Sequence, residues 1–435
     1  MTTGGAPAGR PSDAAEGSPR PPIPLRAWAT YFLCTSAFAY AFFQRVLPSV
    51  IVEDLMTAFA VGGALLGNLS AIYFYTYAAL QIPIGVLTDR LGARLILTVA
   101  LVIAAGGSVL LGMAEAVEEA YLGRALVGIG CSVAFVSTLK LVTVWFPANY
   151  FASLSGGLML FGMAGGMGGQ APLAYLLQFI TWREALLGAG VAAVLIAALV
   201  WLVVRDRPAD AASTGRGRQT VPLGPALLHV ARSGQVWLSA AVAGAMAGPM
   251  LAFAGLWGVP YLEAEYGLSR SAAAGTASLM LLGVAAGGLV GGAISDRIGR
   301  RKLPLYTATI VFAAALGLLL LPGMSHLLAA VLIAVAGFAC GVSVLCYALA
   351  TEQLTPDYAG ACNGVVNMAT VGSGALMQPL IGFLLDLQVP AGVGAPVFTA
   401  AMFREAFIAF PVSAVAAFLL VLTVRETWCR PAASG

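Results

Sequence analysis

The stretch Gly85-Val-Leu-Thr-Asp-Arg-Leu-Gly-Ala-Arg94 decides the fold, because the chain contains it twice. The second copy reads Gly292-Ala-Ile-Ser-Asp-Arg-Ile-Gly-Arg-Arg301 and begins 207 residues after the first. Each copy follows a long apolar run and precedes another. A charged loop that recurs at half-chain spacing indicates an internal duplication. In a chain rich in apolar runs, it predicts two pseudo-symmetric halves.

The composition requires that most of the protein surface faces lipid. Of 435 residues, 60% are hydrophobic and only 9% are charged, whereas a soluble protein carries about 25% charged residues. A membrane-spanning helix needs about 20 apolar residues, so the chain has room for about a dozen spans. The net charge of +3 gives no basic field for nucleic acid. The six cysteines lack metal-ligand spacing and resemble small apolar side chains, so we expect neither a metal site nor a cofactor.

Twelve apolar runs fall into two sets of six, and they predict an all-α membrane protein with twelve transmembrane helices. The first set covers about 27–52, 63–87, 95–114, 119–145, 151–180 and 184–204, and the second about 236–262, 271–294, 303–323, 327–352, 358–385 and 404–424. Residues 27–204 and 236–424 are the predicted six-helix halves, and the polar stretch 205–235 is a cytoplasmic linker. Residues 1–26, rich in Pro, Gly and Ala, are expected to be a disordered cytoplasmic tail, and 425–435 a second tail.

The distribution of cations predicts the orientation in the membrane. The tails, the linker and the loops after even-numbered spans carry sixteen Lys and Arg, whereas the loops after odd-numbered spans carry three. The sixteen are Arg10, Arg20, Arg26, Arg90, Arg94, Arg205, Arg207, Arg216, Arg218, Arg232, Arg297, Arg300, Arg301, Lys302, Arg425 and Arg430; the three are Arg183, Arg270 and Arg404. By the positive-inside rule, both termini lie in the cytoplasm. We therefore expect a multi-pass protein of the cell (inner) membrane.

Further matches between the halves support the duplication, and their order is kept along the chain. The pairs are Gln170-Ala-Pro172 with Gln378-Pro379, Phe146-Pro147 with Thr355-Pro356, and Trp182-Arg-Glu-Ala185 with Phe403-Arg-Glu-Ala406. The duplicated unit is therefore a set of six helices. We expect the positions at which the two copies differ to be those that determine the substrate.

With these motifs the chain resembles the major facilitator superfamily of secondary transporters. The family's signature between helices 2 and 3 has the form Gly-x-Leu-x-Asp-Arg-x-Gly-x-Arg. It corresponds here to Gly85, Leu87, Asp89, Arg90, Gly92 and Arg94, and its degenerate second copy to Gly292, Ile294, Asp296, Arg297, Gly299 and Arg300. Arg124, Gly128 and Gly130 match the family's helix 4 motif, Arg-x-x-x-Gly-x-Gly. The resemblance covers about 27–424 and implies transport by alternating access.

The repeated loop is interpreted as a conformational latch. Its glycines permit a tight turn and a close approach of helix ends, and Asp89 can pair with cations or cap a facing helix. Such an ion pair would stabilise the outward-open state and break when the halves rock. The alternative is a plain positively charged cytoplasmic loop, but two copies in register favour the latch.

Three cations lie inside predicted spans, where charge is costly and indicates function. Arg45 lies three residues before Pro48 in helix 1, and helix 7 has Trp257 three residues before Pro260. We interpret Arg45 and Trp257 as contacts to an asymmetric substrate. The alternative for Arg45 is an arginine that snorkels toward the acidic residues that follow it outside the membrane.

Lys140 and Arg124 share helix 4. We predict a role for Lys140 in transport, since lysine is a compact point charge on a flexible stem; the alternative is snorkelling to the cytoplasmic interface. The two side chains lie about 160° apart around the helix and cannot easily line one wall together. If Lys140 faces the substrate, Arg124 faces a neighbouring helix or lies deeper in the groove.

The remaining polar residues in the spans suit a small anionic or zwitterionic substrate. Each is either a substrate ligand or an ordinary contact between helices: Gln44, Tyr73, Tyr77, Tyr261, Tyr347, Asn367 and Gln378. No Asp or Glu lies mid-span, and a proton-coupled carrier usually needs a titratable group there. Proton symport is therefore not indicated, and uniport or exchange is at least as consistent with the sequence.

A narrower resemblance suggests the substrate. The stretches Arg45-Val-Leu-Pro-Ser-Val50 and Gln81-Ile-Pro-Ile-Gly85, with Lys140 before Trp145-Phe-Pro147, look like the branch of lysosomal dipeptide and bacterial phagosomal amino-acid transporters. This implies a dipeptide or amino acid whose carboxylate meets a buried cation. The alternative is an organic-anion or organophosphate exchanger, although organophosphate antiporters have a second arginine where Trp257 stands.

We therefore predict a monomeric, secondary-active or facilitative transporter of a small carboxylate-bearing solute, embedded in the lipid bilayer. An enzyme is not expected, because no nucleophile–base pair or metal cluster is recognisable. A channel is disfavoured because duplicated six-helix halves suit alternating access. No sequence feature supports a receptor built on a carrier fold.

Overall fold

The computed structural model describes residues 23–147, 150–207, 228–355, 358–389 and 396–429, without the side chains of Ile82, Val86, Asp89 and Ala152. Residues 1–22, 208–227 and 430–435 lie outside this description. The predicted disorder of residues 1–22 and most of the predicted linker therefore stay predictions, whereas α1 begins at Leu25, within the predicted N-terminal tail.

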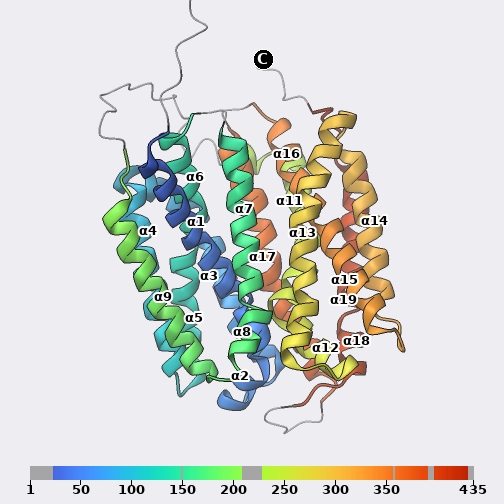
Figure 1. Ribbon diagram of the computed structural model, residues 1–435. Coiled ribbons are helices and arrows are strands. Elements are labelled where there is room, and N and C mark those ends of the chain that lie inside the picture. Colours follow the sequence, from blue (N-terminus) through green and yellow to red (C-terminus); the bar gives the residue numbers. More distant parts are fainter. Residues whose placement is uncertain (1–22, 148–149, 208–227, 356–357, 390–395, 430–435) are drawn as a thin grey trace, which may run out of the picture.

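The N-terminal half forms six helical rods, which match the first six apolar runs (Figure 1). They are α1 (Leu25–Val46) continued by the 3-10 turn η1 (Leu47–Val50), α3 (Gly63–Leu91) preceded by the short α2 (Val52–Phe59), α4 (Ala93–Met113), α5 with α6 (Val117–Cys131 and Ala134–Trp145), α7 with α8 (Phe151–Gly168 and Ala171–Leu176), and α9 (Trp182–Val203).

The C-terminal half repeats this order. Its rods are α11 (Gly234–Ala252) with the π-helical segment η3 (Phe253–Trp257) and α12 (Gly258–Tyr266), α13 (Arg270–Ile298), α14 (Lys302–Leu318), α15 (His326–Gly341) with η4 (Val342–Val344) and α16 (Leu345–Glu352), α17 (Ala359–Asp386), and α18 with α19 (Ala400–Ala406 and Ala409–Thr423). The described chain thus has the twelve-helix, six-plus-six architecture that the sequence predicts.

Length and apolarity alone would have undercounted the spans. Eight helical rods are long and apolar enough to cross a membrane by themselves, and the sharply bent pair of α2 and α3 makes a ninth. The other three rods are α1, which contains Arg45, the broken pair α7 and α8, and α14, which has only 17 residues. Polar or short spans are tolerated where neighbouring helices cover them.

The repeated stretch is largely helical rather than a loop, which corrects the sequence-based interpretation. α3 continues through Asp89 to Leu91 and α13 through Asp296 to Ile298. The turns are made by Gly92, with φ of +88°, and by Gly299, with φ of +65°. Only glycine adopts such backbone angles without strain, so these two glycines allow each helix to end and the next to begin within three residues.

The two halves stand side by side and enclose a shared interior (Figure 1). We call the end of the bundle where α1 begins and α19 ends the terminal side, and the end that carries α2, α12 and α18 the opposite side. The halves contact each other through α3 against α17, through α7 and α8 against α13, and through η1 against η3 and α12.

Prolines inside the helices impose a specific requirement on this packing. A proline lacks the N–H that the carbonyl four residues earlier would accept, so that carbonyl needs another donor at membrane depth. Pro249 frees the carbonyl of Ala245, and the hydroxyl of Ser413 donates to it at 2.8 Å. Pro379 frees the carbonyl of Ala375, and the hydroxyl of Tyr75 donates to it at 2.9 Å. Both donors come from other helices. Each proline therefore favours packing against the helix that carries the donor.

We expect Ser413→Ala to destabilise the protein by about 1 kcal/mol, because the Ala245 carbonyl then loses its only expected donor in an apolar medium. Ser36→Ala is the matched control, since Ser36 donates to the carbonyl of Phe32 on its own helix, and the residue four positions after Phe32 is Ser36 itself, not a proline. Unfolding titrations in detergent micelles measure both. Equal stability of the two variants would contradict the role given to the proline.

Candidate functional site

Arg45 occupies an aromatic enclosure inside the N-terminal half. Its guanidinium carbon lies 4.4 Å from the ring centre of Phe42 on α1 and 5.3 Å, 5.8 Å and 5.8 Å from those of Tyr77, Tyr73 and Phe74 on α3. The residue is only 7% exposed, and the alternative of an arginine that snorkels toward the outer acidic residues is not seen among the described residues, where Glu53 and Asp54 pair with Arg270. Its Nε has no hydrogen-bond partner among the described residues. Aromatic faces stabilise a desolvated cation only partly.

Arg124 supplies the hydrogen-bond donor that Pro48 removes from helix 1. Pro48 frees the carbonyl of Gln44, four residues earlier, and Arg124 on α5 donates to that carbonyl at 2.7 Å. Its guanidinium also lies 4.9 Å from the Tyr73 ring centre. Arg124 is 1% exposed. It therefore faces a neighbouring helix, one of the two orientations considered from the sequence, and it holds the kink that presents Arg45.

Gly128 and Gly130 allow α5 to approach its neighbours closely. A Cβ at Gly128 would overlap the Tyr73 carbonyl and Thr76 on α3, and one at Gly130 would overlap the Ala100 carbonyl on α4. No larger side chain fits unless the backbones separate. These two residues of the helix 4 motif thus fix the distance at which Arg124 meets Tyr73 and α1.

A polar chain extends from the Arg45 enclosure into the C-terminal half. Gln81 follows Tyr77 by one helical turn on α3, and Asn367 on α17 donates to Gln81 Oε1 at 3.2 Å. Tyr347 on α16 donates to Asn367 Oδ1 at 3.2 Å. Gln81, Asn367 and Tyr347 are half-buried, so they are more accessible than Arg45. Tyr73 and Tyr77 thus flank Arg45. Tyr347 and Asn367 belong to the polar chain, together with Gln81, which was not among the candidates.

Four other candidates point elsewhere. The Gln44 amide donates to Tyr40 at 2.6 Å and Ser108 at 2.7 Å, toward α4. Trp257 donates to the carbonyl of Gln378 at 3.0 Å, and the Gln378 amide donates to the carbonyl of Leu251 at 3.0 Å. Tyr261 donates to the carbonyl of Leu319 at 3.2 Å. In this state these side chains hold helices together, and Trp257 does not meet Arg45.

Lys140 lies nearer the terminal side than Arg45. Its Nζ donates to the carbonyl of Thr88 at 2.5 Å, close to the end of α3. Thr88 lies three helical turns beyond Tyr77, a rise of about 16 Å. The structure therefore places Lys140 beside the first copy of the repeated stretch and apart from the aromatic enclosure.

The second copy of the repeated stretch is tied by ion pairs within its own half. Arg301 pairs with Asp296 at 2.5 Å and with Glu352 on α16 at 2.9 Å. Burial lowers the pKa of Arg301, but its hydrogen bonds to Glu352 and Asp296 outweigh this, so the pKa is raised. The motif alignment selected Arg300, but the ion pairs are made by Arg301. The guanidinium carbon of Arg300 instead lies 5.0 Å from the ring centre of Trp428.

The first copy differs in its partners. Arg94 donates to the carbonyl of Trp201 at 2.6 Å and lies 4.0 Å over its ring. Arg90, like Arg297 in the second copy, is exposed. The side chain of Asp89 lies outside the described residues, so the predicted latch through Asp89 stays a prediction.

Two acidic residues that sequence analysis missed bind the turns. Asp206 follows α9 and accepts from the backbone N–H of Arg94 at 3.0 Å. Glu426 follows α19 and accepts from the backbone N–H groups of Arg301 and Lys302 at 2.8 Å and 3.0 Å. Each carboxylate therefore lies at the positive N-terminal end of the helix after the turn. The repeated phrase Val-Arg-acid, at 204–206 and 424–426, was the available signal.

Polar contacts between the halves concentrate toward the opposite side. Asp386, at the end of α17, accepts from the backbone N–H groups of Gly63 and Ala64 at 2.7 Å and 2.8 Å, and so caps α3. Arg270 pairs with Asp54 at 2.7 Å. Among the described residues, Gln81 makes the cross-half hydrogen bond nearest the terminal side. In this state the halves are joined on the opposite side and separable on the terminal side.

A family model describes nearly the whole architecture. The model of the Major Facilitator Superfamily matches residues 33–379 and again 250–433. The chain belongs to the major facilitator superfamily. Most of the similar proteins are named as transporters and one, UhpC of Salmonella typhimurium, as a membrane sensor protein, and none is named as an enzyme. Membership of the family confirms the prediction drawn from the repeated stretch.

Curated relatives match most of the chain at low identity. The uncharacterized transporter YybO of Bacillus subtilis is 24% identical, over 83% of this chain and 88% of its own. The gallate transporter of Pseudomonas putida is 27% identical, with 91% and 95% covered. The probable sulfoacetate transporter SauU of Cupriavidus necator is 23% identical, with 80% and 84% covered.

Solved structures confirm the fold. A bacterial homologue of the human lysosomal transporter Spinster, in an inward-facing and occupied conformation, superposes with a TM-score of 0.72 at 20% identity, covering 94% of this chain and 97% of that one. A D-xylose–proton symporter gives a TM-score of 0.71 at 15% identity, with 93% and 99% covered. At such identities the likeness concerns the fold alone.

We expect Asp386→Ala to shift the protein toward states that are separated on the opposite side. Loss of a helix cap costs about 1 kcal/mol, which corresponds to a population change of about fivefold. Spin-label distances between α2 and α12 report that separation. Thr181→Ala is the matched control, because Thr181 caps α9 within one half. Identical distance distributions in Asp386→Ala and wild type would contradict the role given to Asp386 in joining the halves.

Proposed function

We propose that the protein transports a small carboxylate-bearing anion by alternating access, with Arg45 as the group that binds the carboxylate. The observation that carries this proposal is the buried guanidinium in its enclosure of Phe42, Tyr73, Phe74 and Tyr77, with Nε unpartnered. A buried cation without a counter-ion is costly. An anion that enters from the half-buried chain of Gln81, Asn367 and Tyr347 would offset that cost.

The chemistry of the enclosure favours an anion over a zwitterion. In the described part of the chain, no carboxylate pairs with or hydrogen-bonds to Arg45, Tyr73 or Tyr77, so the ammonium of an amino acid or dipeptide would find only phenol oxygens and ring faces. Relatives named for gallate, sulfoacetate and nitrate support an anionic substrate class. A dipeptide or amino acid remains the alternative that the sequence resemblance favours, and an organophosphate the second.

The orientation follows from the cation count. We propose that the terminal side faces the cytoplasm and that the protein resides in the inner membrane, because the Arg-rich turns after α3 and α13 lie there. With the halves joined through Asp386 and Arg270 on the opposite side, the described state then corresponds to an inward-open one. Transport requires these bonds to break while new contacts form on the cytoplasmic side.

We expect Arg45→Gln to reduce uptake by roughly 30- to 100-fold at low substrate, because a charge-assisted hydrogen bond to the carboxylate is lost. Arg45→Lys, which keeps the charge but not the fork geometry, retains intermediate uptake. Counterflow in liposomes with gallate-like carboxylates, their uncharged amides, dipeptides and organophosphates tests the class. Arg183→Gln is the control, since Arg183 binds backbone carbonyls on the opposite side.

The competing outcomes are distinguishable. Uptake of the amides as fast as the acids would exclude a carboxylate site. Preference for dipeptides or for organophosphates would select one of the alternatives. Wild-type uptake by folded Arg45→Gln protein, as judged by thermal unfolding, would overturn the assignment of Arg45.

Lys140 is proposed to act on the last turn of α3, where it donates to the Thr88 carbonyl, and not on the substrate. We therefore expect Lys140→Gln to lower the maximal transport rate by about tenfold, equivalent to about 1.4 kcal/mol, while KM stays within twofold of wild type. Arg45→Gln should instead raise KM. A large rise of KM in Lys140→Gln would contradict this proposal and indicate that Lys140 contacts the substrate.

A further inference from the structure

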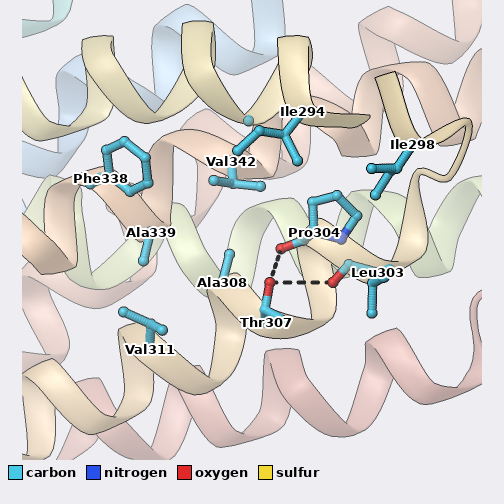
Figure 2. A pocket seen from close by; sticks show the side chains of 11 residues that line it. Ile294, Ile298, Leu303, Pro304, Thr307, Ala308, Val311, Phe338, Ala339 and Val342 are labelled. Atoms are coloured by element: carbon cyan, nitrogen blue, oxygen red, sulfur yellow. Dashed lines mark hydrogen bonds between the residues drawn. The ribbon is translucent and has the colours of Figure 1, made fainter. Parts of the chain in front are cut away.

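The lipid-facing surface of the C-terminal half carries an apolar groove of about 350 Å³ (Figure 2). Ile294 and Ile298 of α13 form one wall, Leu303 and Val311 of α14 the other, and Phe338 of α15 lies in the floor. These five side chains are 37–46% exposed. Thr307, the polar residue in the lining, turns its hydroxyl to the carbonyls of Pro304 and Leu303 on its own helix.

The groove is a consequence of how the three helices pack. α15 packs against both α13 and α14, whereas α13 and α14, joined by the short turn at 299–301, contact each other little. The two helices thus diverge from the turn and leave a furrow over α15. From Leu303 to Val311 the furrow extends about 12 Å along α14. It begins at the terminal side and descends into the hydrocarbon layer.

Two arginines that have no acidic partner among the described residues lie where the groove begins. Arg297 directly precedes the wall residue Ile298, and Arg300 lies in the turn before Leu303. Both are exposed, and neither forms an ion pair among the described residues, whereas Arg301 beside them takes both Asp296 and Glu352. Glu426 is occupied by the N–H groups of the turn.

These arginines lie at the depth of the lipid headgroups in the membrane. Trp428, which is 54% exposed, lies beneath Arg300 with 5.0 Å between guanidinium carbon and ring centre. Tryptophan and arginine at the ends of spans are typical of the membrane–water interface. An apolar furrow that runs from such a cationic rim into the membrane matches a molecule with an anionic head and an apolar chain.

We propose that this groove is a binding site for an anionic phospholipid, with one acyl chain in the furrow and the headgroup phosphate held by Arg297 and Arg300. Arginine suits this role because its planar fork donates two parallel hydrogen bonds to phosphate oxygens. A zwitterionic lipid supplies the same chain and phosphate, but its ammonium adds a positive charge at a rim that already has two. The site therefore selects for net negative headgroups.

The test is native mass spectrometry of the full-length protein released from detergent in the presence of phosphatidylglycerol or phosphatidylcholine. We expect one tightly retained phosphatidylglycerol and a preference over phosphatidylcholine of about 30-fold, from roughly fivefold for each arginine near an anionic headgroup. The double variant Arg297→Gln with Arg300→Gln should lose the preference. Thr307→Trp, which fills the groove from the lipid-facing side, should lose the retained lipid altogether.

Controls separate the site from ordinary boundary lipid. Arg90→Gln removes the exposed arginine at the equivalent place of the first copy and should leave the preference intact. Glycerol phosphate, which has the phosphate without the chain, should not be retained; its retention would identify a phosphate site and overturn the lipid site. Unchanged lipid retention in Thr307→Trp, or an unchanged preference in the double arginine variant, would also overturn it. Thermal unfolding verifies that each variant is folded.

Discussion

A backbone carbonyl that a proline leaves without its donor must find another one inside the membrane, and this constraint organises the interior. In hydrocarbon an unsatisfied carbonyl costs several kcal/mol. Three such carbonyls accept from side chains of other helices: Arg124 donates to Gln44, Ser413 to Ala245 and Tyr75 to Ala375. Helix kinks and helix neighbours are therefore specified together, and the last of these bonds joins the two halves.

The same constraint divides the buried arginines by role. Arg124 is committed to the Gln44 carbonyl, so its charge is part of the scaffold. Arg45, on the helix that this bond supports, is surrounded by ring faces and has no carboxylate partner among the described residues. Unpartnered nitrogens occur on both side chains, Nε of Arg45 and Nε with one terminal nitrogen of Arg124, so they do not separate the two roles. The bond to the Gln44 carbonyl does: it makes Arg124 part of the helix scaffold and leaves Arg45 as the proposed substrate contact.

The sequence predicts the architecture well because duplication and apolar runs are long-range signals that survive local irregularity. It predicts side-chain directions less well: Gln44 and Trp257 lie in the predicted spans but turn toward Ser108 and Gln378. The motif selects Arg300 in the second copy, whereas the ion pairs in the structure belong to Arg301; the latch itself stays a prediction. The role of Asp386 has no local signal, since its partners are backbone groups more than 300 residues away.

The bonds between the halves differ in how easily they can break. Asp386 caps α3 at the opposite end of the bundle, where its carboxylate and the freed N–H groups can be hydrated once the halves separate. The bond from Tyr75 to Ala375 lies three helical turns deeper, a rise of about 17 Å, and its carbonyl has no backbone donor because of Pro379. Breaking the deeper bond is therefore the more costly step. Rocking that retains it while the cap at Asp386 opens is the motion of lowest cost, which makes the contact of α3 with α17 near Tyr75 the pivot of the two halves.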